Sequence, residues 1–254
     1  MGSIISISNQ KGGVGKTTTA INLSACLAEK GKKVLTVDID PQGNTSSGLG
    51  LDKNAVENTS YDLLISDIDI HDCIHESLID NLSVIPSNID LSGAEIELIE
   101  FEDREFLLKN KLDQVRDEYD FIIIDCPPSL NMLTINAMAA SDSAIVPIQC
   151  EYYALEGLSQ LIKTVNLVNE HLNPDFKIEG IVFTMFDSRT NLSEQVVDAV
   201  KENLYQRAYK TMIPRNVRLA EAPSYGLPIT EYDSRSAGAS AYRSLADEIL
   251  ADYE

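Results

Sequence analysis

Short apolar runs alternate along the chain with longer segments in which apolar residues recur every three or four positions. The runs are typical of strands buried on both faces of a parallel sheet, and the longer segments have the period of amphipathic helices. The alternation predicts an α/β fold, a doubly wound, mostly parallel sheet with helices on both faces. The expected strands are 3–8, 33–37, 82–86, 119–125, 144–148, 178–185 and 209–214, and the expected helices are 19–27, 92–117, 131–140, 154–171, 192–206 and 236–252.

The composition, 44% hydrophobic and 24% charged residues, is typical of a folded protein. Glycines and prolines are scattered, with no linker-like cluster or repeat, so we expect residues 1–254 to form one domain. Four cysteines lie far apart, which favours reduced thiols in a cytoplasmic protein over a metal or iron–sulfur site. No segment approaches the roughly 20 apolar residues of a membrane span, and no signal peptide precedes the first strand.

The segment NQKGGVGKTT, residues 9–18, joins the first strand to the first helix. A glycine-rich turn in this position binds nucleotide phosphates, because backbone N–H groups can approach the oxygens and the helix N-terminus adds partial positive charge. A turn without a ligand is the alternative, and the flanking strand and helix argue against it. We expect a P-loop NTPase fold that binds a nucleotide and Mg²⁺; the family resemblance described below implies that the nucleotide is ATP. The expected nucleotide-binding residues of the loop are Lys11, Gly12, Gly13, Val14, Gly15, Lys16, Thr17 and Thr18.

Three of these residues have expected roles in phosphate binding. Lys16 should reach the β- and γ-phosphates and serve in catalysis, and Thr17 should place its hydroxyl on Mg²⁺. Thr18 would contact the α-phosphate.

The loop departs from two common patterns. The pattern G-x-x-x-x-G-K-[ST] requires glycine at position 10, where Gln10 stands, and G-x-G-x-x-G fails because Thr18 stands at its last position. A second lysine, Lys11, precedes the paired glycines. The sequence KGGVGKTT is a deviant Walker A signature, and the chain resembles the ParA/Soj chromosome- and plasmid-partition ATPases of the wider ParA/MinD group. Residues 125–129, 149–157 and 213–218 extend this resemblance over nearly the whole chain.

Three aspartates follow buried strands, where ligands bind in parallel sheets. Asp125 occupies the Walker B position and is expected to hold Mg²⁺, mostly through water; the alternative is a turn residue that only ends the strand. Asp38 and Asp40 match the second acidic motif of the family. By resemblance, Asp40 orients the attacking water near the metal and Asp38 supports the metal, although an Asp-Pro-Gln-Gly turn alone would be an ordinary loop.

The resemblance also implies contacts beyond the phosphate site. In the ParA/MinD group a lysine at the position of Lys11 crosses a dimer interface to the partner's nucleotide, which implies a catalytic residue supplied in trans and two chains that sandwich two ATP molecules. Pro214 and Asn216 match adenine-side positions. Arg189 and Arg218 match positions that contact nonspecific double-stranded DNA. A solvated surface charge is the alternative for all three basic residues.

The formal net charge of −20 is unusual for a DNA-binding protein. Residues 51–125 hold 5 basic and 20 acidic residues, whereas 189–218 hold 6 basic and 3 acidic ones. DNA binding is therefore not excluded, but it should be weak and salt-sensitive. We hypothesise that the acidic region 51–125 attracts a basic partner peptide, with a solvated acidic face as the alternative.

The resemblance implies an ATP-dependent DNA segregation switch, cytoplasmic and associated with the nucleoid. In this class an ATP-bound dimer binds DNA, and a DNA-bound ParB-type partner stimulates slow hydrolysis and release. A MinD-like membrane-positioning ATPase is the alternative, but it requires a basic amphipathic C-terminal helix, and residues 244–254 carry acids and no base. We therefore expect no membrane partner.

An ATPase resembling the nitrogenase iron protein would need interfacial cysteines, for which Cys126 is poorly placed. A sequence-specific repressor would need a helix-turn-helix domain before the loop. We do not expect this function, because only the first strand precedes the loop in this sequence.

Overall fold

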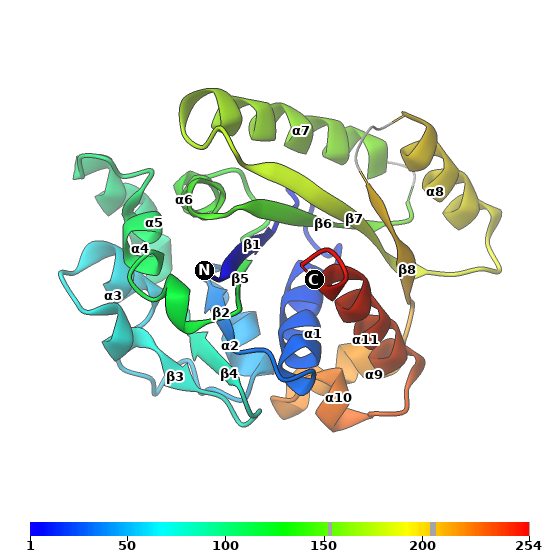
Figure 1. The fold of residues 1–254 in the computed structure, drawn as a ribbon, viewed down its shortest axis with the longest axis horizontal. Helices are drawn as coiled ribbons and strands as arrows, with labels where there is room; N and C mark the ends of the chain where they lie inside the picture. Colours follow the sequence, from blue (N-terminus) through cyan, green and yellow to red (C-terminus); the bar gives the residue numbers. More distant parts are fainter. Residues whose placement is uncertain (152–153, 204–206, 254) are drawn as a thin grey trace.

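The computed structural model describes residues 1–254 except 152–153, 204–206 and 254. The described residues form an eight-stranded sheet in the order β3-β4-β2-β5-β1-β6-β7-β8, in which β3 alone runs antiparallel to its neighbour. Helices lie on both faces of this sheet (Figure 1). The predicted fold class is therefore confirmed. The strands are β1 (Ser3–Ile7), β2 (Val34–Asp38), β3 (His75–Glu76), β4 (Leu82–Ile85), β5 (Phe121–Asp125), β6 (Ser143–Gln149), β7 (Lys177–Phe186) and β8 (Ala208–Pro214).

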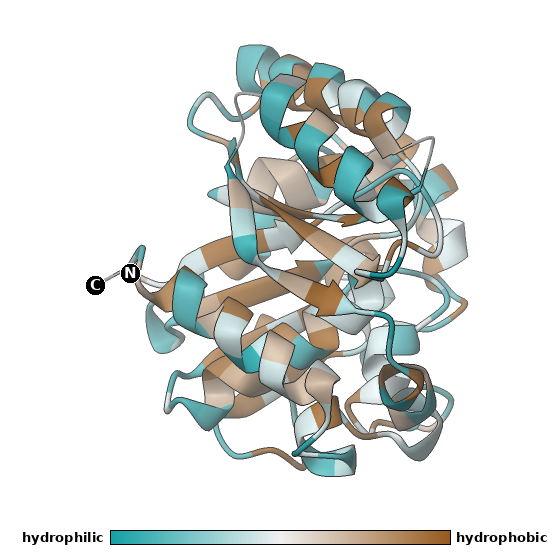
Figure 2. Cartoon of the chain, turned by 90° about the vertical axis from the view of Figure 1, so that its right-hand side faces the viewer, coloured by the Kyte–Doolittle hydropathy of each residue, from teal (hydrophilic) through white to brown (hydrophobic). Residues whose placement is uncertain are grey.

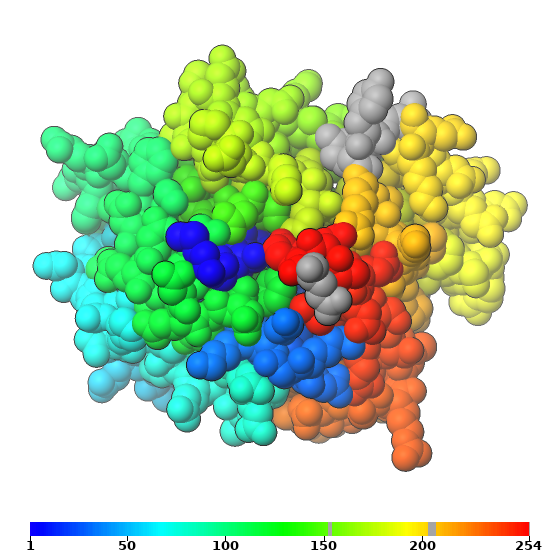
Figure 3. Space-filling model, viewed as in Figure 1, coloured from blue at the N-terminus to red at the C-terminus, as the bar shows by residue number. Residues whose placement is uncertain are grey.

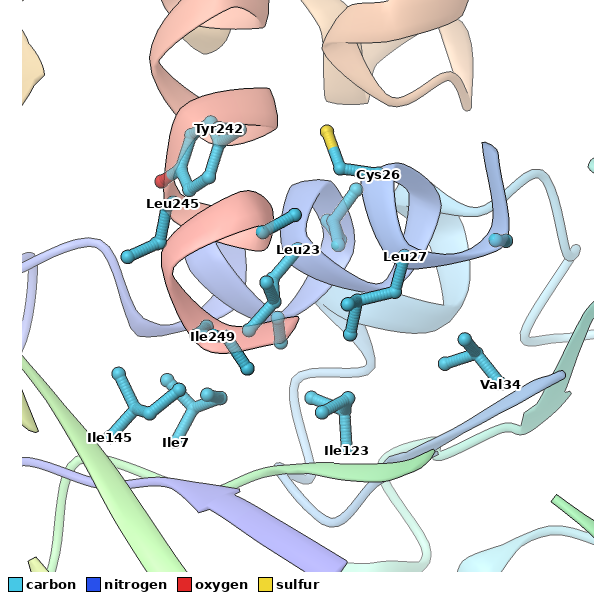
Figure 4. Close-up of a cluster of buried hydrophobic side chains, with 14 of the residues drawn as sticks. Ile7, Leu23, Cys26, Leu27, Val34, Ile123, Ile145, Tyr242, Leu245 and Ile249 are labelled. Atoms are coloured by element: carbon cyan, nitrogen blue, oxygen red, sulfur yellow. The ribbon is translucent and has the colours of Figure 1, made fainter. Parts of the chain in front are cut away.

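The two faces of the sheet are covered by different helices. On one face, Leu23 and Leu27 of α1 (Lys16–Glu29) and Ile249 of α11 (Ala237–Leu250) lie over Ile7 and Ile123 (Figure 4). The alternate strand residues face α3 to α8 on the other side, so both faces require apolar residues. Figure 2 shows the result, with hydrophobic strands inside and polar residues on the outward helix faces. The helices are α1 (Lys16–Glu29), α2 (Asn44–Gly48), α3 (Ser60–Ile65), α4 (Leu91–Glu97), α5 (Leu107–Leu112), α6 (Met132–Ala140), α7 (Ala154–His171), α8 (Asn191–Asn203), α9 (Val217–Glu221), α10 (Ile229–Tyr232) and α11 (Ala237–Leu250), with 3₁₀ turns η1 (Ile70–Cys73), η2 (Leu98–Glu100), η3 (Arg116–Glu118) and η4 (Ala222–Tyr225).

Strand register brings the chemistry-bearing segments together. Strand β5 lies between β1 and β2, and Asp125 is the register partner of both Ile7 and Asp38. The glycine-rich loop follows Ile7 directly. The loop and the two aspartates therefore meet at the carboxyl edge of the sheet, where ligands bind in folds of this kind.

One predicted helix is wrong. The expected helix 92–117 is divided into α4, η2, α5 and η3. Its periodicity misled the prediction because apolar residues on both sides of the break, such as Leu98 and Leu108, are buried in one cluster. The break falls in a polar stretch in which Asp103 has a left-handed φ of 53°. Of the expected helix 192–206, the last three residues lie outside the described part of the chain.

The ends of the chain lie close together. The N-terminal residues and the last described C-terminal residues are neighbours on the surface in Figure 3. Tyr253 contacts Phe121 at the start of β5, with ring centroids 5.2 Å apart in an edge-to-face arrangement. Within the described residues, no helix has the length and apolar character needed to cross a membrane.

Candidate functional site

The glycine-rich loop leaves a helix N-terminus open. Gly13 and Gly15 have φ of 75° and 89°, a region that L side chains rarely adopt, so the loop requires glycine at both positions. No side chain caps α1. Asn9 and Thr184, which the sequence prediction missed, fix the loop. The Asn9 amide donates to the Pro147 carbonyl at 2.8 Å, and the Thr184 hydroxyl donates to the Val14 carbonyl at 2.7 Å. The uncapped amides are suited to binding an anion.

Lys16 is a buried cation at the first residue of this helix. Its side chain is 6% exposed, and Nζ donates to the Lys11 carbonyl at 3.1 Å. Burial lowers the pKa of Lys16, an effect opposed by the negative charges of Asp125 and Asp40 nearby. A buried ammonium whose hydrogen-bond partner is a neutral carbonyl is an unfavourable arrangement that an anionic ligand would improve.

Asp125 and Thr17 face each other beside Lys16. Asp125 Oδ2 accepts hydrogen bonds from Thr17 Oγ1 at 2.8 Å and from Thr45 Oγ1 at 2.7 Å. Its other oxygen, Oδ1, is buried and has no hydrogen-bond partner among the described residues. Burial, reinforced by the charge of Asp38, raises the pKa of Asp125. An unpaired buried carboxylate oxygen beside a threonine hydroxyl fits a hard divalent cation such as Mg²⁺.

Asp38 and Asp40 are held by the turn that starts α2. Asp38 Oδ2 accepts from the Ser46 amide at 2.9 Å and the Ser46 hydroxyl at 2.7 Å. Burial raises the pKa of Asp38 despite these bonds. Asp40 Oδ1 accepts a hydrogen bond from the backbone N–H of Gln42 at 2.9 Å, and Asp40 lines the same cleft as the glycine-rich loop. Ser46 and Thr45 were not predicted; the polar run that follows the Asp-Pro-Gln-Gly turn was the available signal.

Lys11 points toward its own chain. Its Nζ lies 2.6 Å from Oε2 of Glu151, and the two side chains are 37% and 46% exposed. Glu151 lies in the segment 149–157, which carries part of the family resemblance, but no role was predicted for Glu151 from the sequence. Tyr152 and Tyr153 of that segment lie outside the described residues.

A second cavity adjoins the phosphate cleft. Pro214 and Asn216, the predicted adenine-side residues, line it, and it shares Gly15, Thr18 and Met185 with the cleft beside the loop. Asn216 also accepts from the Arg218 amide at 2.8 Å, which caps α9 and fixes its side chain. The geometry thus places an apolar-walled cavity next to a phosphate-binding loop, as a nucleotide requires.

Arg189 and Arg218, the predicted DNA-binding residues, follow the ends of the neighbouring strands β7 and β8, whose Phe186 and Pro214 are register partners. Arg189 forms two hydrogen bonds to Asp187, at 2.8 and 2.7 Å. These bonds hold the pKa of the Asp187 carboxyl well below its ordinary value. Arg218 lies 2.9 Å from Glu221 and 3.6 Å from Asp233. Both arginines are exposed but already have acidic partners.

Thiol chemistry has little support in the described part of the chain. All four cysteines are buried and unpaired. Cys126, which adjoins Asp125, accepts a hydrogen bond from Ser8 Oγ at 3.3 Å, and burial raises the pKa of its thiol. Among the described residues no three His, Cys, Asp or Glu side chains converge as a closed metal site. A Mg²⁺ ion at Thr17 and Asp125 would therefore complete its coordination with phosphate oxygens and water, as is usual for this ion.

Comparison with known proteins agrees with this geometry. Residues 2–178 match the AAA domain family AAA_31. The chain is 60% identical over 252 residues to the sporulation initiation inhibitor protein Soj of Bacillus subtilis, covering 99% of this chain and 100% of that protein. It is 52% identical over 250 residues to the chromosome partitioning protein ParA of Myxococcus xanthus, covering 98% and 88%.

Two solved structures of one protein with the same fold contain nucleotides. Cobyrinic acid a,c-diamide synthase of Mycobacterium smegmatis, solved with ADP and magnesium and with an ATP analog and magnesium, is 36% identical with a TM-score of 0.89. The match covers 100% of this chain and 96% of that one.

Proposed function

We propose that this chain, which belongs to the Soj/ParA family of chromosome-partitioning ATPases, works as an ATP-dependent DNA segregation switch. It is an ATPase whose cofactors are ATP and Mg²⁺. In the proposed cycle, ATP drives formation of a sandwich dimer that binds nonspecific double-stranded DNA in the cytoplasm, at the nucleoid. A DNA-bound ParB-type partner stimulates slow hydrolysis, which releases the dimer.

One observation carries the proposal for the reaction. An uncapped helix N-terminus and the buried ammonium of Lys16 line one cleft, and the unpaired carboxylate oxygen belongs to Asp125, which lies directly behind Thr17 of that cleft. Each is unfavourable alone, and a nucleotide triphosphate with a divalent cation would satisfy all three together.

The residues of the site have different proposed roles in phosphoryl transfer to water. Lys16 and the loop amides bind and orient the phosphates, and Thr17 and Asp125 would hold Mg²⁺, with Asp38 in support. Bound there, the ion supplies positive charge that offsets the charge on the transferring phosphoryl group. Asp40, in the wall of the same cleft, orients the attacking water; positioning matters more here than strong basicity.

Dimer formation and DNA binding use exposed groups near the same edge. Lys11 is the residue that would reach the partner's nucleotide, and to do so it must leave Glu151. Arg189 and Arg218 are the proposed DNA contacts. Their acidic partners must exchange for DNA phosphate, which agrees with weak and salt-sensitive binding.

Cosedimentation tests this function. The chain is spun with nonspecific DNA or with anionic liposomes, in ATP or in ADP, across a salt series. DNA pelleting that requires ATP and weakens with salt supports the switch. Liposome binding without DNA binding would overturn it in favour of a membrane-positioning ATPase. Asp40→Ala should trap the ATP dimer on DNA; normal hydrolysis by this variant would contradict the role of Asp40.

A further inference from the structure

We propose that the exposed face of α4 and η2, residues 89–101, is a docking surface for a cationic amphipathic helix of the partner that stimulates hydrolysis. This inference rests on the proposed switch function and names a site and a partner chemistry for its trigger. We call this surface the α4 face.

The α4 face carries an apolar stripe that is largely exposed among the described residues. Ile89, Ile96 and Ile99 are 66%, 74% and 64% exposed, and Phe101 is 38% exposed. With Ser92, the isoleucines have 3-4-3 spacing through the turn before α4, α4 itself and η2, and the buried residues Leu91, Ala94 and Leu98 alternate with them. Scattered surface apolar residues are ordinary, but four in one thirteen-residue segment form a patch of the kind that binds a partner helix.

Unpaired acids flank the stripe. Within the described residues, the side chains of Asp90, Glu100 and Glu102 have no hydrogen bond or ion pair, and they lie in the most acidic region of the sequence. A second copy of this face, or an anionic lipid surface, would be repelled by them. A helix with Lys or Arg beside its apolar stripe would bury the isoleucines and pair with the acids, so charge complementarity selects that occupant.

Two hydrogen bonds connect α4 and the segment leading into it to residues next to the nucleotide site. Glu95 accepts a hydrogen bond from Asn131, the residue that caps α6 after the Asp125 loop. The Ser87 amide, at the entry to α4, donates to Ser46 Oγ at 2.9 Å, and Ser46 in turn binds Asp38. A helix docked on α4 could therefore shift the segments that hold Asp38 and Asp125, which is the effect required of a hydrolysis trigger.

The test uses a synthetic amphipathic Leu/Lys helix of about 20 residues, about 30 Å long and therefore long enough to cover the whole stripe, and a scrambled peptide of the same composition. Fluorescence anisotropy measures binding to the full chain. Ile96→Ser/Ile99→Ser should weaken binding of the amphipathic peptide about 10-fold, the usual scale for losing buried anchor residues. Glu100→Lys/Glu102→Lys should weaken it as much. Matched controls away from the face, Leu167→Ser and Glu170→Lys/Asp175→Lys, should bind as wild type does.

Several further outcomes would overturn the proposed docking site. Equal binding of the scrambled peptide, or wild-type affinity in both face variants, would overturn the proposal. So would loss of a wild-type dimer, or loss of vesicle binding, in Ile96→Ser/Ile99→Ser, because the occupant would then be a second copy or lipid. The face variants should keep basal ATPase activity and ATP-dependent DNA pelleting. If the wild type does not pellet with DNA, the switch function fails, whereas peptide binding still reports on the face.

Discussion

Lys11 and Glu151 form an ion pair within one chain, with 2.6 Å between Nζ and Oε2. In the proposed dimer Lys11 instead reaches the partner's nucleotide, so the intrachain pair competes with dimerisation. Glu151→Gln removes this competition. A partly exposed ion pair contributes about 0–1 kcal/mol, so the fraction of ATP-bound dimer should rise several-fold at a given chain concentration.

Analytical ultracentrifugation with an ATP analog measures that change. Glu156→Gln, a similar change at an exposed neighbour, is the control and should leave the monomer–dimer equilibrium alone. A Glu151→Gln chain that dimerises less than wild type would show that Glu151 supports the dimer rather than opposing it.

Lys16→Ala should abolish nucleotide binding without harming the fold. The ammonium is buried, and its pKa is lowered by burial, so its removal takes away an unfavourable charge from the ligand-free protein. Thermal melts should show an unchanged or higher Tm without ligand and no shift with Mg–ATP. Wild type should gain several degrees with Mg–ATP because the ligand binds the folded state. An Mg–ATP shift retained in the variant would contradict the role of Lys16.

Asp125→Asn should change the pH dependence of stability. Burial raises the folded-state pKa of Asp125, so ionisation costs stability: the cost is absent below the unfolded pKa of about 4 and complete once pH exceeds the raised folded value. Without ligand, the variant should therefore gain Tm relative to wild type at pH 8 and lose that advantage toward pH 4. With Mg–ATP it should lose the metal-dependent stabilisation. A variant less stable than wild type at pH 8 would mean that the Thr17 and Thr45 bonds outweigh burial.

The fold and the centre of the site were predictable because local sequence determines them. Continuous apolar strands specify a covered parallel sheet, and residues 9–18 carry their own geometric requirement through Gly13 and Gly15. The strand ends then bring Asp38 and Asp125 together by register alone.

Other parts depend on contacts between segments that no local pattern records. Thr184 reaches the glycine-rich loop from 170 positions away, and Glu151 reaches Lys11 from 140. The break within 92–117 was hidden because the apolar period continues through it. The apolar stripe on α4 was hidden for the same reason: Ile89, Ile96 and Ile99 resemble core residues until burial shows that the opposite side of the helix faces inward.

Asp187→Asn should strengthen DNA binding by releasing Arg189. Two hydrogen bonds hold the guanidinium on Asp187, although the arginine side chain is 85% exposed. If Arg189 contacts phosphate, it must exchange one carboxylate for another anion, and the variant removes the competing charge. We expect a severalfold rise in DNA affinity with ATP at low salt, shrinking as salt rises. Filter binding or cosedimentation across a salt series measures this rise in affinity.

Arg189→Ala should weaken binding and abolish the gain when combined with Asp187→Asn. If the double variant keeps the gain, the effect comes from the general loss of a negative charge, and Arg189 is then a solvated surface residue rather than a DNA contact.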